Sequence, residues 1–545
     1  MGLTNLPPGS EAPTDVVTRK VFINDTELSN EILLSQLSVV KSFNKIASAK
    51  LVFKDGSAAD RDFALSNDDK FKPGNEIKIQ MGYHGQVDTI FEGIIIKHAV
   101  KVMRGSSALI IDAKDKAIKL TGARKSVYHN NKIDSDVMTT LAGSLKKDID
   151  PTKPAQVQLV QFDSTDWDFI VTRAEANGML VLTDDGKLII KKPVLTPPAV
   201  LVATYGANIW EFEAEMDARR QVQSVAAHSW DYTKQEAENS TNGTAQGFTE
   251  PGNLSSADLA AVMATEVNLT HPGHLQQDHL QNWADAFALR NKLSKAVGRV
   301  RVTGNAKVKP GTMITLQGVG NRFNGDVFVT GVLHQFSGLW QTDIQFGWKE
   351  DLFYHKEKVM DKPAAGLLPG INGLHIGKVI TAKDDPDGQF RIKVHVPTIT
   401  SGNEGIWARV ATLDAGPERG SYFRPVKDDE VVLGFLNDDP REAIILGCMH
   451  SKDKNKSPLP ENANGLEFGF VTKEKIKMIF DDTNKRMTLS VKTASGVKSI
   501  ILNDSNSAME LKDENGNTIK MEASGITIDA GKGNVTIKGS KVMIN

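Results

Sequence analysis

The stretch that decides the fold is residues 511–529, LKDENGNTIKMEASGITID, near the end of a 545-residue chain. Its apolar residues come in doublets two positions apart, Ile519/Met521 and Ile526/Ile528, with polar residues between them. A period of two sends alternate side chains to opposite faces of a β-strand. The Asn-Gly and Ser-Gly steps between the doublets supply tight turns. The stretch therefore predicts very short strands, stacked one on the next.

The same pattern runs from residue 487 almost to the last residue. The doublets that we expect to form an apolar core are Met487/Leu489, Ile500/Leu502, Met509/Leu511, Ile519/Met521, Ile526/Ile528 and Val535/Ile537. A further doublet, Val542/Ile544, belongs with Met543 and Asn545 to the blunt end of the array. Seven layers at about 4.7 Å each give a stack of roughly 30 Å. We call residues 456–545, a connector followed by this array, the needle.

Upstream of the needle, residues 373–455 predict a small closed barrel of the OB type, because five short strand candidates follow one another within about 75 residues. These candidates are His375–Ile380, Phe390–Val396, Trp407–Thr412, Val431–Phe435 and Ala443–Gly447. Residues 355–372, with Pro363 and Pro369-Gly370, read as a linker.

The first 354 residues, which we call the hub, predict two β-rich units around a helical insert. We expect a first β-barrel domain over 1–120, an α/β insert over 121–195, and a second β-barrel domain over 196–354. In the insert, Thr165 is a good N-cap for a helix that ends at Asn177-Gly178. In the second unit, 233–256 reads as a long mobile loop, and a helix is expected over about 277–297, with Gly298 past its end. The fold class is thus mainly β with a helical insert.

Bulk composition excludes several classes of protein. Sixty-five basic residues balance 67 acidic ones, which gives no sign of a polyanion-binding protein. The single cysteine, Cys448, excludes an internal disulfide framework, and its apolar surroundings favour a small buried side chain. The polar, Pro-rich start of the chain has neither a secretory signal nor a membrane-spanning stretch. We therefore expect synthesis and folding in a cytoplasm.

The stretch 423–440, FRPVKDDEVVLGFLNDDP, resembles the signature of VgrG-type central spike proteins of contractile injection systems. That signature has a Pro, then Gly-Asp-Glu-Val, an alternating apolar strand, and Gly-Asp-Pro. Here Asp428 and Asp438 stand where the signature has Gly, and Ala443 where a Pro is common. These departures fall in turns. Residues 301–348 and 165–182 also look like parts of the VgrG hub, so the resemblance runs through roughly the whole chain. The chain is also similar to the fused hub and needle of contractile-tailed phages.

The resemblance implies a homotrimer whose needle is an intertwined triple-stranded β-helix. The burial of apolar surface also favours a trimer. One chain has a single apolar needle face with nothing to cover it, whereas three chains can turn their apolar faces inward. It also implies a PAAR-type tip protein seated on Val542, Met543, Ile544 and Asn545, inner tube and baseplate proteins at the hub, and possible effector cargo. The particle would be membrane-anchored or released, and would meet a membrane only during puncture.

The sequence shows only weak signs of metal-binding or catalytic motifs. His271, His274 and His279 lie close in sequence, but Pro272-Gly273 breaks their spacing, so a loop is favoured over a zinc site. Asp384–Gly388 has the look of a calcium loop but lacks the closing Glu, and a hairpin turn explains it better. No Walker A, Gly-x-Ser-x-Gly or His-Glu-x-x-His pattern occurs. We expect no catalytic residue, no cofactor and no metal.

The main hypothesis is a structural trimeric spike that punctures a target envelope and carries a tip protein or cargo. The alternative is a spike-associated cell-wall hydrolase, or a metal-dependent enzyme using the His271 cluster. The connector between the barrel and the doublets, residues 451–480, has about 30 residues and is too short for a separate enzyme domain. A carbohydrate-binding tail fibre fits the hub poorly. Nucleic-acid binding by the barrel is not expected, because residues 423–442 are acidic rather than basic.

Overall fold

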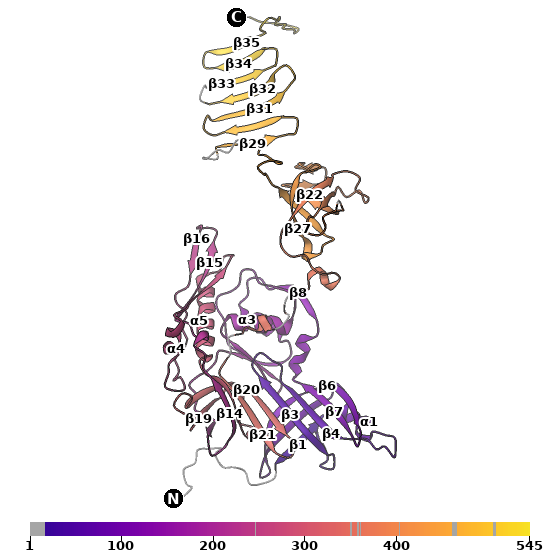
Figure 1. Ribbon diagram of the computed structural model, residues 1–545, viewed down its shortest axis with the longest axis vertical. Coiled ribbons are helices and arrows are strands. Elements are labelled where there is room, and N and C mark those ends of the chain that lie inside the picture. Colours follow the sequence, from indigo (N-terminus) through magenta and orange to yellow (C-terminus); the bar gives the residue numbers. More distant parts are fainter. Residues whose placement is uncertain are drawn as a thin grey trace. The chain divides into compact units, whose positions relative to one another are not determined.

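The computed structural model describes residues 17–245, 247–348, 351–356, 359, 361–402, 404–459, 466–504 and 508–544. It divides into two compact units, Met1–Asp361 and Lys362–Asn545. Figure 1 shows the strands and helices of each unit in chain order, and we describe the two units separately.

The first unit is organised by one large sheet. Its strand order is β14-β18-β21-β20-β3-β4-β7-β6-β5-β1-β2, and β19 joins it through β20 and carries β13. The strands of the N-terminal half are β1 (Thr18–Ile23), β2 (Thr26–Glu27), β3 (Leu34–Ser42), β4 (Ser48–Lys54), β5 (Glu76–Tyr83), β6 (Gln86–Met103) and β7 (Ser106–Lys114). Those of the C-terminal half are β13 (Leu201–Thr204), β14 (Ile209–Glu215), β18 (Val297–Thr303), β19 (Met313–Gln317), β20 (Gly325–Phe336) and β21 (Trp340–Phe346).

The two β-rich hub units predicted from the sequence are joined rather than separate. Strand β20 of the second pairs antiparallel with β3 of the first, from Gly331 opposite Ser42 to Phe336 opposite Leu37. Each half keeps its own apolar core, one around Leu51, Ile79 and Phe91, the other around Val300. The hub is therefore one continuous sheet with two cores.

The helical insert packs on this sheet. It contains β8 (Arg124–Tyr128), α2 (Asp134–Leu141), β9 (Lys146–Ile149), β10 (Val160–Thr165), α3 (Asp166–Ala176), β11 (Leu180–Asp184) and β12 (Lys187–Lys191). Thr165 caps α3 as expected, because its hydroxyl accepts the backbone N–H of Asp168 at 3.1 Å. Ile170 and Ala174 of α3 are fully buried, so the helix is fixed by its apolar face as well as by its cap.

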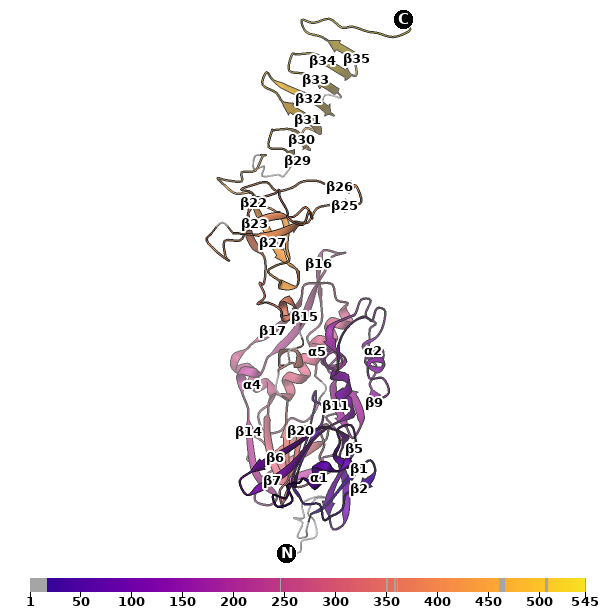
Figure 2. The ribbon, with the colours of Figure 1, turned by 90° about the vertical axis from the view of Figure 1, so that its right-hand side faces the viewer.

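A second helical layer belongs to the C-terminal half of the hub. It contains β15 (Ser224–Asp231), β16 (Glu236–Asn239), α4 (Ser256–Met263), β17 (Glu266–His271) and α5 (Gln277–Leu293). Figure 2 shows the hub from the side, with α4 and α5 on the β15 side. Single-turn elements complete the hub and the start of the second unit: α1 (Ala64–Asn67), η1 (Asp69–Phe71), η2 (Lys116–Thr121), η3 (Ala218–Arg220), α6 (Phe353–Lys356), η4 (Pro363–Gly366) and, within the barrel, η5 (Leu436–Asp438).

One local prediction was wrong here. The helix expected to reach residue 297 ends at Leu293, and Gly298 lies inside β18, between Ala214 and Phe346. A Cβ at position 298 would lie 2.3 Å from the backbone oxygen of Glu213, so this glycine permits close strand packing rather than ending a helix.

The stretch 233–256 was predicted as a long mobile loop. Its described residues form β16 and, from Ser240 to Ser255, no helix or strand, so the stretch is largely a loop, and it is tied to the helices. The Glu250 carboxylate accepts both the backbone N–H and the hydroxyl of Ser256, at 2.7 and 2.8 Å. The buried Lys295 ammonium donates to the Pro251 carbonyl at 2.6 Å and lies 3.3 Å from Glu250. Buried charge pairing, which composition does not reveal, holds this segment.

A buried charge cluster joins the insert to both halves of the hub. Lys41 on β3, only 2% exposed, places its Nζ 2.5 Å from Asp184 and 2.7 Å from Asp185, at the turn between β11 and β12. Lys309, which precedes β19, reaches the same carboxylates at 3.0 and 3.2 Å. Burial acts to raise the pKa of Asp184, but the two lysines outweigh it and lower that pKa.

His334 on β20 is buried beside this cluster, with its Nδ1 3.0 Å from the Thr342 hydroxyl. Burial, then the charges of Lys41 and Lys309, lower its pKa to about 3. The unfolded chain takes up this proton near pH 6.5, while the folded chain stays neutral until about pH 3. Hub stability is therefore expected to fall as pH drops below 6.5, by about 1.4 kcal/mol per pH unit.

The free energy of unfolding of the His334→Gln variant should not show this fall between pH 6.5 and 4. Denaturant unfolding of the full chain at several pH values measures it, with the exposed His355→Gln as control. An unchanged slope in His334→Gln would refute the assignment.

The second unit begins with the predicted barrel. Five strands close in the order β22-β23-β24-β28-β27, with a small hairpin between β24 and β27. The barrel strands are β22 (His375–Thr381), β23 (Ile392–His395), β24 (Ile406–Val410), β27 (Glu430–Phe435) and β28 (Ala443–Cys448), and the hairpin consists of β25 (Ala415–Gly416) and β26 (Arg419–Gly420). The core is packed by Val379, Val394, Val431 and Ile445, all at most 1% exposed. The OB-type fold expected from the sequence is confirmed.

The needle is a seven-stranded antiparallel sheet in which each strand pairs with the next in sequence. Its strands are β29 (Glu467–Val471), β30 (Lys477–Asp481), β31 (Arg486–Lys492), β32 (Val497–Asn503), β33 (Ala508–Lys512), β34 (Thr518–Glu522) and β35 (Gly525–Asp529). Figures 1 and 2 show these strands as a ladder that follows the chain toward its C-terminus.

The needle differs from the prediction at both ends. The expected connector over residues 451–480 already contains β29 and β30, so the strand layers begin earlier along the chain than the doublets indicated. At the other end, Val542 and Ile544 follow the last strand and lie outside strands, and Asn545 lies outside the described residues.

Val535 and Ile537 form no strand layer in the single chain, although a further layer was predicted for them. Both residues follow β35 and lie outside strands, and in the single chain Val535 is 51% exposed and Ile537 is 69% exposed. Gly531, Gly533 and Gly539 surround this doublet, and glycine raises the entropy cost of ordering a segment into a strand. In the single chain Ile537 is therefore an exposed side chain of a segment without regular structure, and its place in the apolar core of the three-chain needle stays a prediction.

Candidate functional site

The candidate site is one face of the needle, where the register aligns the apolar doublets strand by strand. One column consists of Phe470, Met478, Leu489, Ile500, Leu511, Ile519 and Ile528. The column beside it consists of Phe468, Phe480, Met487, Leu502, Met509, Met521 and Ile526. Each strand contributes one residue to each column, because residues two apart in a strand share a face.

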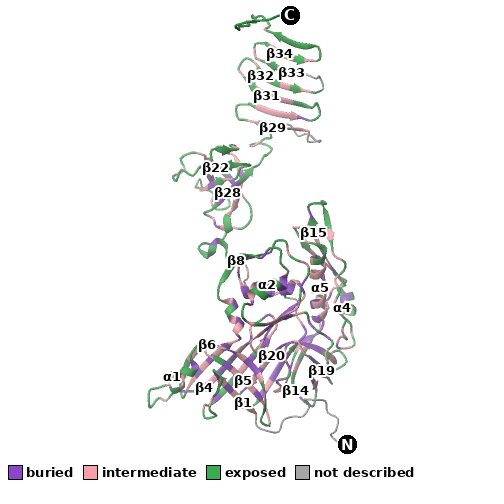
Figure 3. Cartoon of the chain, turned by 180° about the vertical axis from the view of Figure 1, so that it is seen from behind, coloured by how far each residue is buried: buried purple, intermediate pink, exposed green. Residues whose placement is uncertain are grey.

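This face is uncovered in the single chain. Leu489, Ile500, Leu511 and Ile519 are 37–45% exposed, and Ile526 is 68% exposed. Figure 3 shows the needle strands mostly in pink and green, whereas the strands of the hub sheet carry much of the purple of buried residues. A contiguous apolar face of this length is unusual on a monomeric surface and indicates a binding partner.

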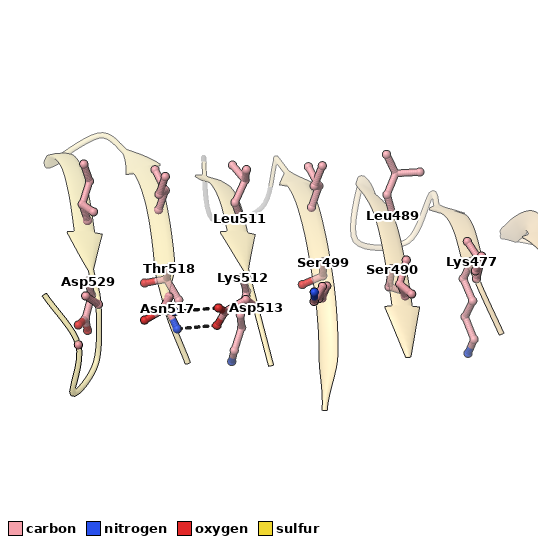
Figure 4. A pocket seen from close by; sticks show the side chains of 18 of the residues that line it. Lys477, Leu489, Ser490, Ser499, Leu511, Lys512, Asp513, Asn517, Thr518 and Asp529 are labelled. Carbon is pink, nitrogen blue, oxygen red and sulfur yellow. Dashed lines mark hydrogen bonds between the residues drawn. The ribbon is translucent and has the colours of Figure 1, made fainter. Parts of the chain in front are cut away.

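The first column also lines an open groove of about 830 Å³ that runs across the strands. Figure 4 shows Leu489 and Leu511 in its apolar row, while Asp513 pairs with Asn517 at its polar margin. The Asp513 carboxylate also accepts the backbone N–H groups of Asn515 and Asn517, so it forms the turn between β33 and β34. The described residues that line the groove make an interface surface rather than a substrate pocket, since they bring no catalytic groups together.

The opposite face of the needle is mostly polar, although Ile479 and Ile501 lie in its central column. Thr488, Glu510, Lys520 and Thr527 occupy the intervening positions of their strands, and Lys520 lies opposite both Glu510 and Thr527. The two faces therefore have the opposite character that the period of two predicts.

Four of the column residues were missed from the sequence: Phe468, Phe470, Met478 and Phe480. They show the same i, i+2 pattern as the later doublets, and this signal was available. Because residues 451–480 were predicted to be the connector, these four were not among the predicted core residues.

The residues predicted beyond Ile528 lie outside both columns. Val535 and Ile537, predicted as core, are exposed after β35, and so are the predicted docking residues Val542, Met543 and Ile544. The ordered columns of the single chain therefore end with Ile526 and Ile528.

The three histidines of the expected loop have separate neighbours. His271 Nδ1 lies 2.9 Å from the Gly273 carbonyl oxygen, and His274 Nδ1 lies 3.9 Å from Asp231. His279, on α5, is half-buried, and burial lowers its pKa. Within the described ranges, no group of three or more His, Cys, Asp or Glu side chains is placed to hold a metal ion.

The calcium-like loop is a turn closed by its own arginine. The Asp385 carboxylate accepts the backbone N–H groups of Gln389 and Arg391 at 2.9 and 3.0 Å, and the Arg391 guanidinium lies 2.7 Å away. These bonds, led by the one from Arg391, hold the pKa of Asp385 well below its usual range. A guanidinium thus occupies the carboxylate that a calcium ion would need.

Cys448 corrects another expectation. It is exposed at the end of β28, rather than buried as its apolar neighbours suggested. Partial burial, helped by Asp429, raises the pKa of its thiol. Among the helices of the described part of the chain, none is both long and apolar enough to cross a membrane.

Family models match three consecutive parts of the chain. The model described as Alg8 N-terminal domain matches residues 13–338, which is more than half of the chain. The type VI secretion system/phage-baseplate injector OB domain matches 375–450, and the phage baseplate V C-terminal trimerisation domain matches 477–545.

Curated relatives match a shorter segment. The type VI secretion system spike protein VgrG3 of Vibrio cholerae is 34% identical over 102 residues, 17% of this chain and 10% of the relative. The actin cross-linking toxin VgrG1 of Vibrio cholerae is 32% identical over 102 residues, 17% of this chain and 9% of the relative. The chain thus spans about a tenth of the length of these relatives.

Solved structures are similar at low identity. The tail protein from Neisseria meningitidis has a TM-score of 0.46 at 15% identity, covering 62% of this chain and 99% of that one. The E. coli c3393 protein, a component of the type VI secretion system, has a TM-score of 0.40 at 14% identity, covering 79% and 100%. A Francisella PdpA-VgrG complex has a TM-score of 0.39 at 10% identity, covering 95% and 80%.

The order of the three family matches, hub, injector OB domain and trimerisation domain, agrees with the signature at residues 423–440. The chain belongs to the Alg8 N-terminal domain family and is a VgrG-type spike protein.

Proposed function

We propose that this chain is the structural, trimeric spike at the tip of the inner tube of a contractile injection system. The observation that carries the proposal is the uncovered apolar face of the needle, two aligned columns across seven strands. Three such faces turned inward bury one another as a triangular prism. At about 25 cal/mol per Å² of apolar surface removed from water, the doublets supply a large driving force for assembly.

The trimer makes mechanical sense for puncture. Every needle strand is hydrogen-bonded to its neighbours in sequence, so stiffness does not depend on long loops. Sheath contraction supplies the work, and the needle supplies a narrow, stiff tip that enters the target envelope. Burying the columns also removes an aggregation-prone face from solvent.

The two ends of the chain would meet different partners. Val542, Met543 and Ile544 are exposed, and three copies form an apolar end suited to a PAAR-type tip protein. Asn545, assigned to the same end, lies outside the described residues. The hub, with a first β domain over 1–120, an insert over 121–195 and a second β domain over 196–354, would contact inner tube and baseplate proteins. Effector cargo would travel with this assembly, membrane-anchored or released, after synthesis in the cytoplasm.

A non-enzymatic role fits the site better than catalysis. The separate surroundings of His271, His274 and His279 weaken the metal-dependent alternative. The acidic stretch 423–442 of the barrel likewise fits a structural part rather than a nucleic-acid groove. Purified protein should digest no peptidoglycan, and digestion would revive the hydrolase alternative.

The mass of the full chain in solution tests the proposal directly. We expect a particle of three chains of 59.4 kDa each, stable on dilution to about micromolar concentration. Light scattering or analytical ultracentrifugation measures it. A monomeric full-length chain would contradict the proposed function.

A further inference from the structure

Exposed aromatic side chains gather where the barrel loops approach the first needle strand. Only 6% of the residues of the chain are aromatic. Yet five exposed ones lie on two barrel loops and on β29: Phe390, Tyr422, Phe423, Phe468 and Phe470. Large aromatic side chains left in water at such density indicate an interface.

The loop that carries Phe390 is built to hold it outward. Phe390 has a φ of +57° and is 76% exposed. A left-handed backbone conformation is unfavourable for a bulky residue and persists only where neighbours enforce it. Here Asp385 accepts the backbone N–H groups on both sides of Phe390, those of Gln389 and Arg391. The loop is therefore fixed before any partner arrives, so that less freedom is lost on binding.

The two barrel loops and the needle are linked. Arg424 donates from Nη2 to the Arg391 carbonyl at 3.3 Å, which ties the Tyr422–Phe423 loop to the Phe390 loop. Phe423 stacks on Phe470 of β29, with ring centroids 5.2 Å apart and planes 13° from parallel. Phe470 in turn lies opposite Met478 and begins the first apolar column of the needle.

This continuity identifies the occupant. The trimerisation domain model begins at residue 477, just after β29. A neighbouring chain that covers Met478 and Leu489 in a three-fold needle also reaches Phe470, the next residue of the same column, and with it the stacked Phe423. We propose that Phe390, Tyr422, Phe423, Phe468 and Phe470 form an aromatic collar that is buried against the other two copies of this chain. The inference rests on the proposed trimer and extends the interface from the needle into the barrel.

The collar is tested by accessibility in the full chain. Replacing the only cysteine by Cys448→Ser gives a background for single thiols. Phe390→Cys and Tyr422→Cys then report on the collar, and Thr527→Cys on the polar face of the needle serves as control. Each maleimide labelling rate is divided by the rate of the same variant in denaturant. We expect the two collar thiols to react at least tenfold more slowly than the Thr527→Cys thiol.

The mass of each labelled sample separates the collar from the trimer. A trimer in which both collar thiols react as fast as the control overturns the collar and leaves the spike standing. This result would mean that the aromatic surface is free for a different protein. Monomeric background protein would instead overturn the proposed function itself. Two collar positions are used so that a local effect of one substitution does not decide the result.

Discussion

Ile528→Asp is expected to abolish the trimer, whereas Thr527→Asp, one residue away, should leave it intact. Ile528 continues the first apolar column opposite Ile519, and it is 54% exposed in the single chain. The aspartate therefore costs little before assembly and much after it, when three carboxylates meet in an apolar interior. Each buried unpaired charge costs several kcal/mol, so the association constant should fall by roughly a thousandfold or more.

Thr527 provides the matched control because it lies on the polar face, opposite Lys520. An aspartate there gains a positive neighbour and stays in water. Sedimentation of both variants at equal concentration is the measurement. If both remain trimeric, or both dissociate, the inward and outward faces of the needle have been assigned wrongly.

Lys41→Met is expected to destabilise the hub by about 3 kcal/mol, the lower end of the cost of removing one partner from a buried ion pair. Lys41 is 2% exposed and contacts both Asp184 and Asp185. Without it only Lys309 pairs with the two carboxylates, and the insert loses this ion pair with β3. Denaturant unfolding at pH 7 measures the loss.

The same pair of carboxylates sets the pH dependence of this effect. Because the pKa of Asp184 is lowered in the folded state, its contribution is present above pH 3.8 and is lost as pH falls through the folded value. The difference in free energy of unfolding between the Lys41→Met variant and the parent should therefore become smaller below pH 3.8. Lys309→Met, at a side chain that is 34% exposed, is the control and should cost under about 1 kcal/mol. Equal losses in the two variants would refute the central role of Lys41.

Periodicity predicted the middle of the needle well because its strands are local. The doublets from Met487 to Ile528 all fall in β31–β35, and the turn residues between them need no distant partner. The first column residues, Phe470 and Met478, were missed because Gly469 and Ile479 interrupt the alternation with polar residues that marks most of the later doublets.

At the end of the needle, periodicity predicted more strands than the single chain forms. Val535 and Ile537 show the same spacing as the earlier doublets, yet they form no strand in the single chain, where Ile537 is about as exposed as the column residue Ile526. Spacing alone does not record how much entropy the neighbouring glycines lose when a segment is ordered. The Val542/Ile544 doublet failed to predict a strand for the same reason, since Gly539 precedes it.

Long-range contacts could not be predicted in the same way. Lys41 and Asp184 are 143 residues apart, and nothing in either local sequence marks the other as a partner. The Lys295–Pro251 bond that fixes the predicted loop is of the same kind. The end of α5 was misplaced because Gly298 reads as a helix stop, although its real role depends on a distant strand, β14. The fold class could be predicted from the sequence pattern and the resemblance. The contacts that join the parts of the hub could be found only in the structure.

The sequential order of β29 to β35 makes the needle respond differently to the two directions of force. In a sheet where each strand bonds only to its predecessor and successor, the ladder bonds run across the strands, along the stacking direction. Pushing on the end presses the rungs together and loads all the layers at once. Pulling on the C-terminus instead loads β35 alone, then β34, so that the strands peel off one by one at low force. A needle of this topology therefore resists compression as it enters a target, but it unfolds strand by strand when its C-terminal end is pulled.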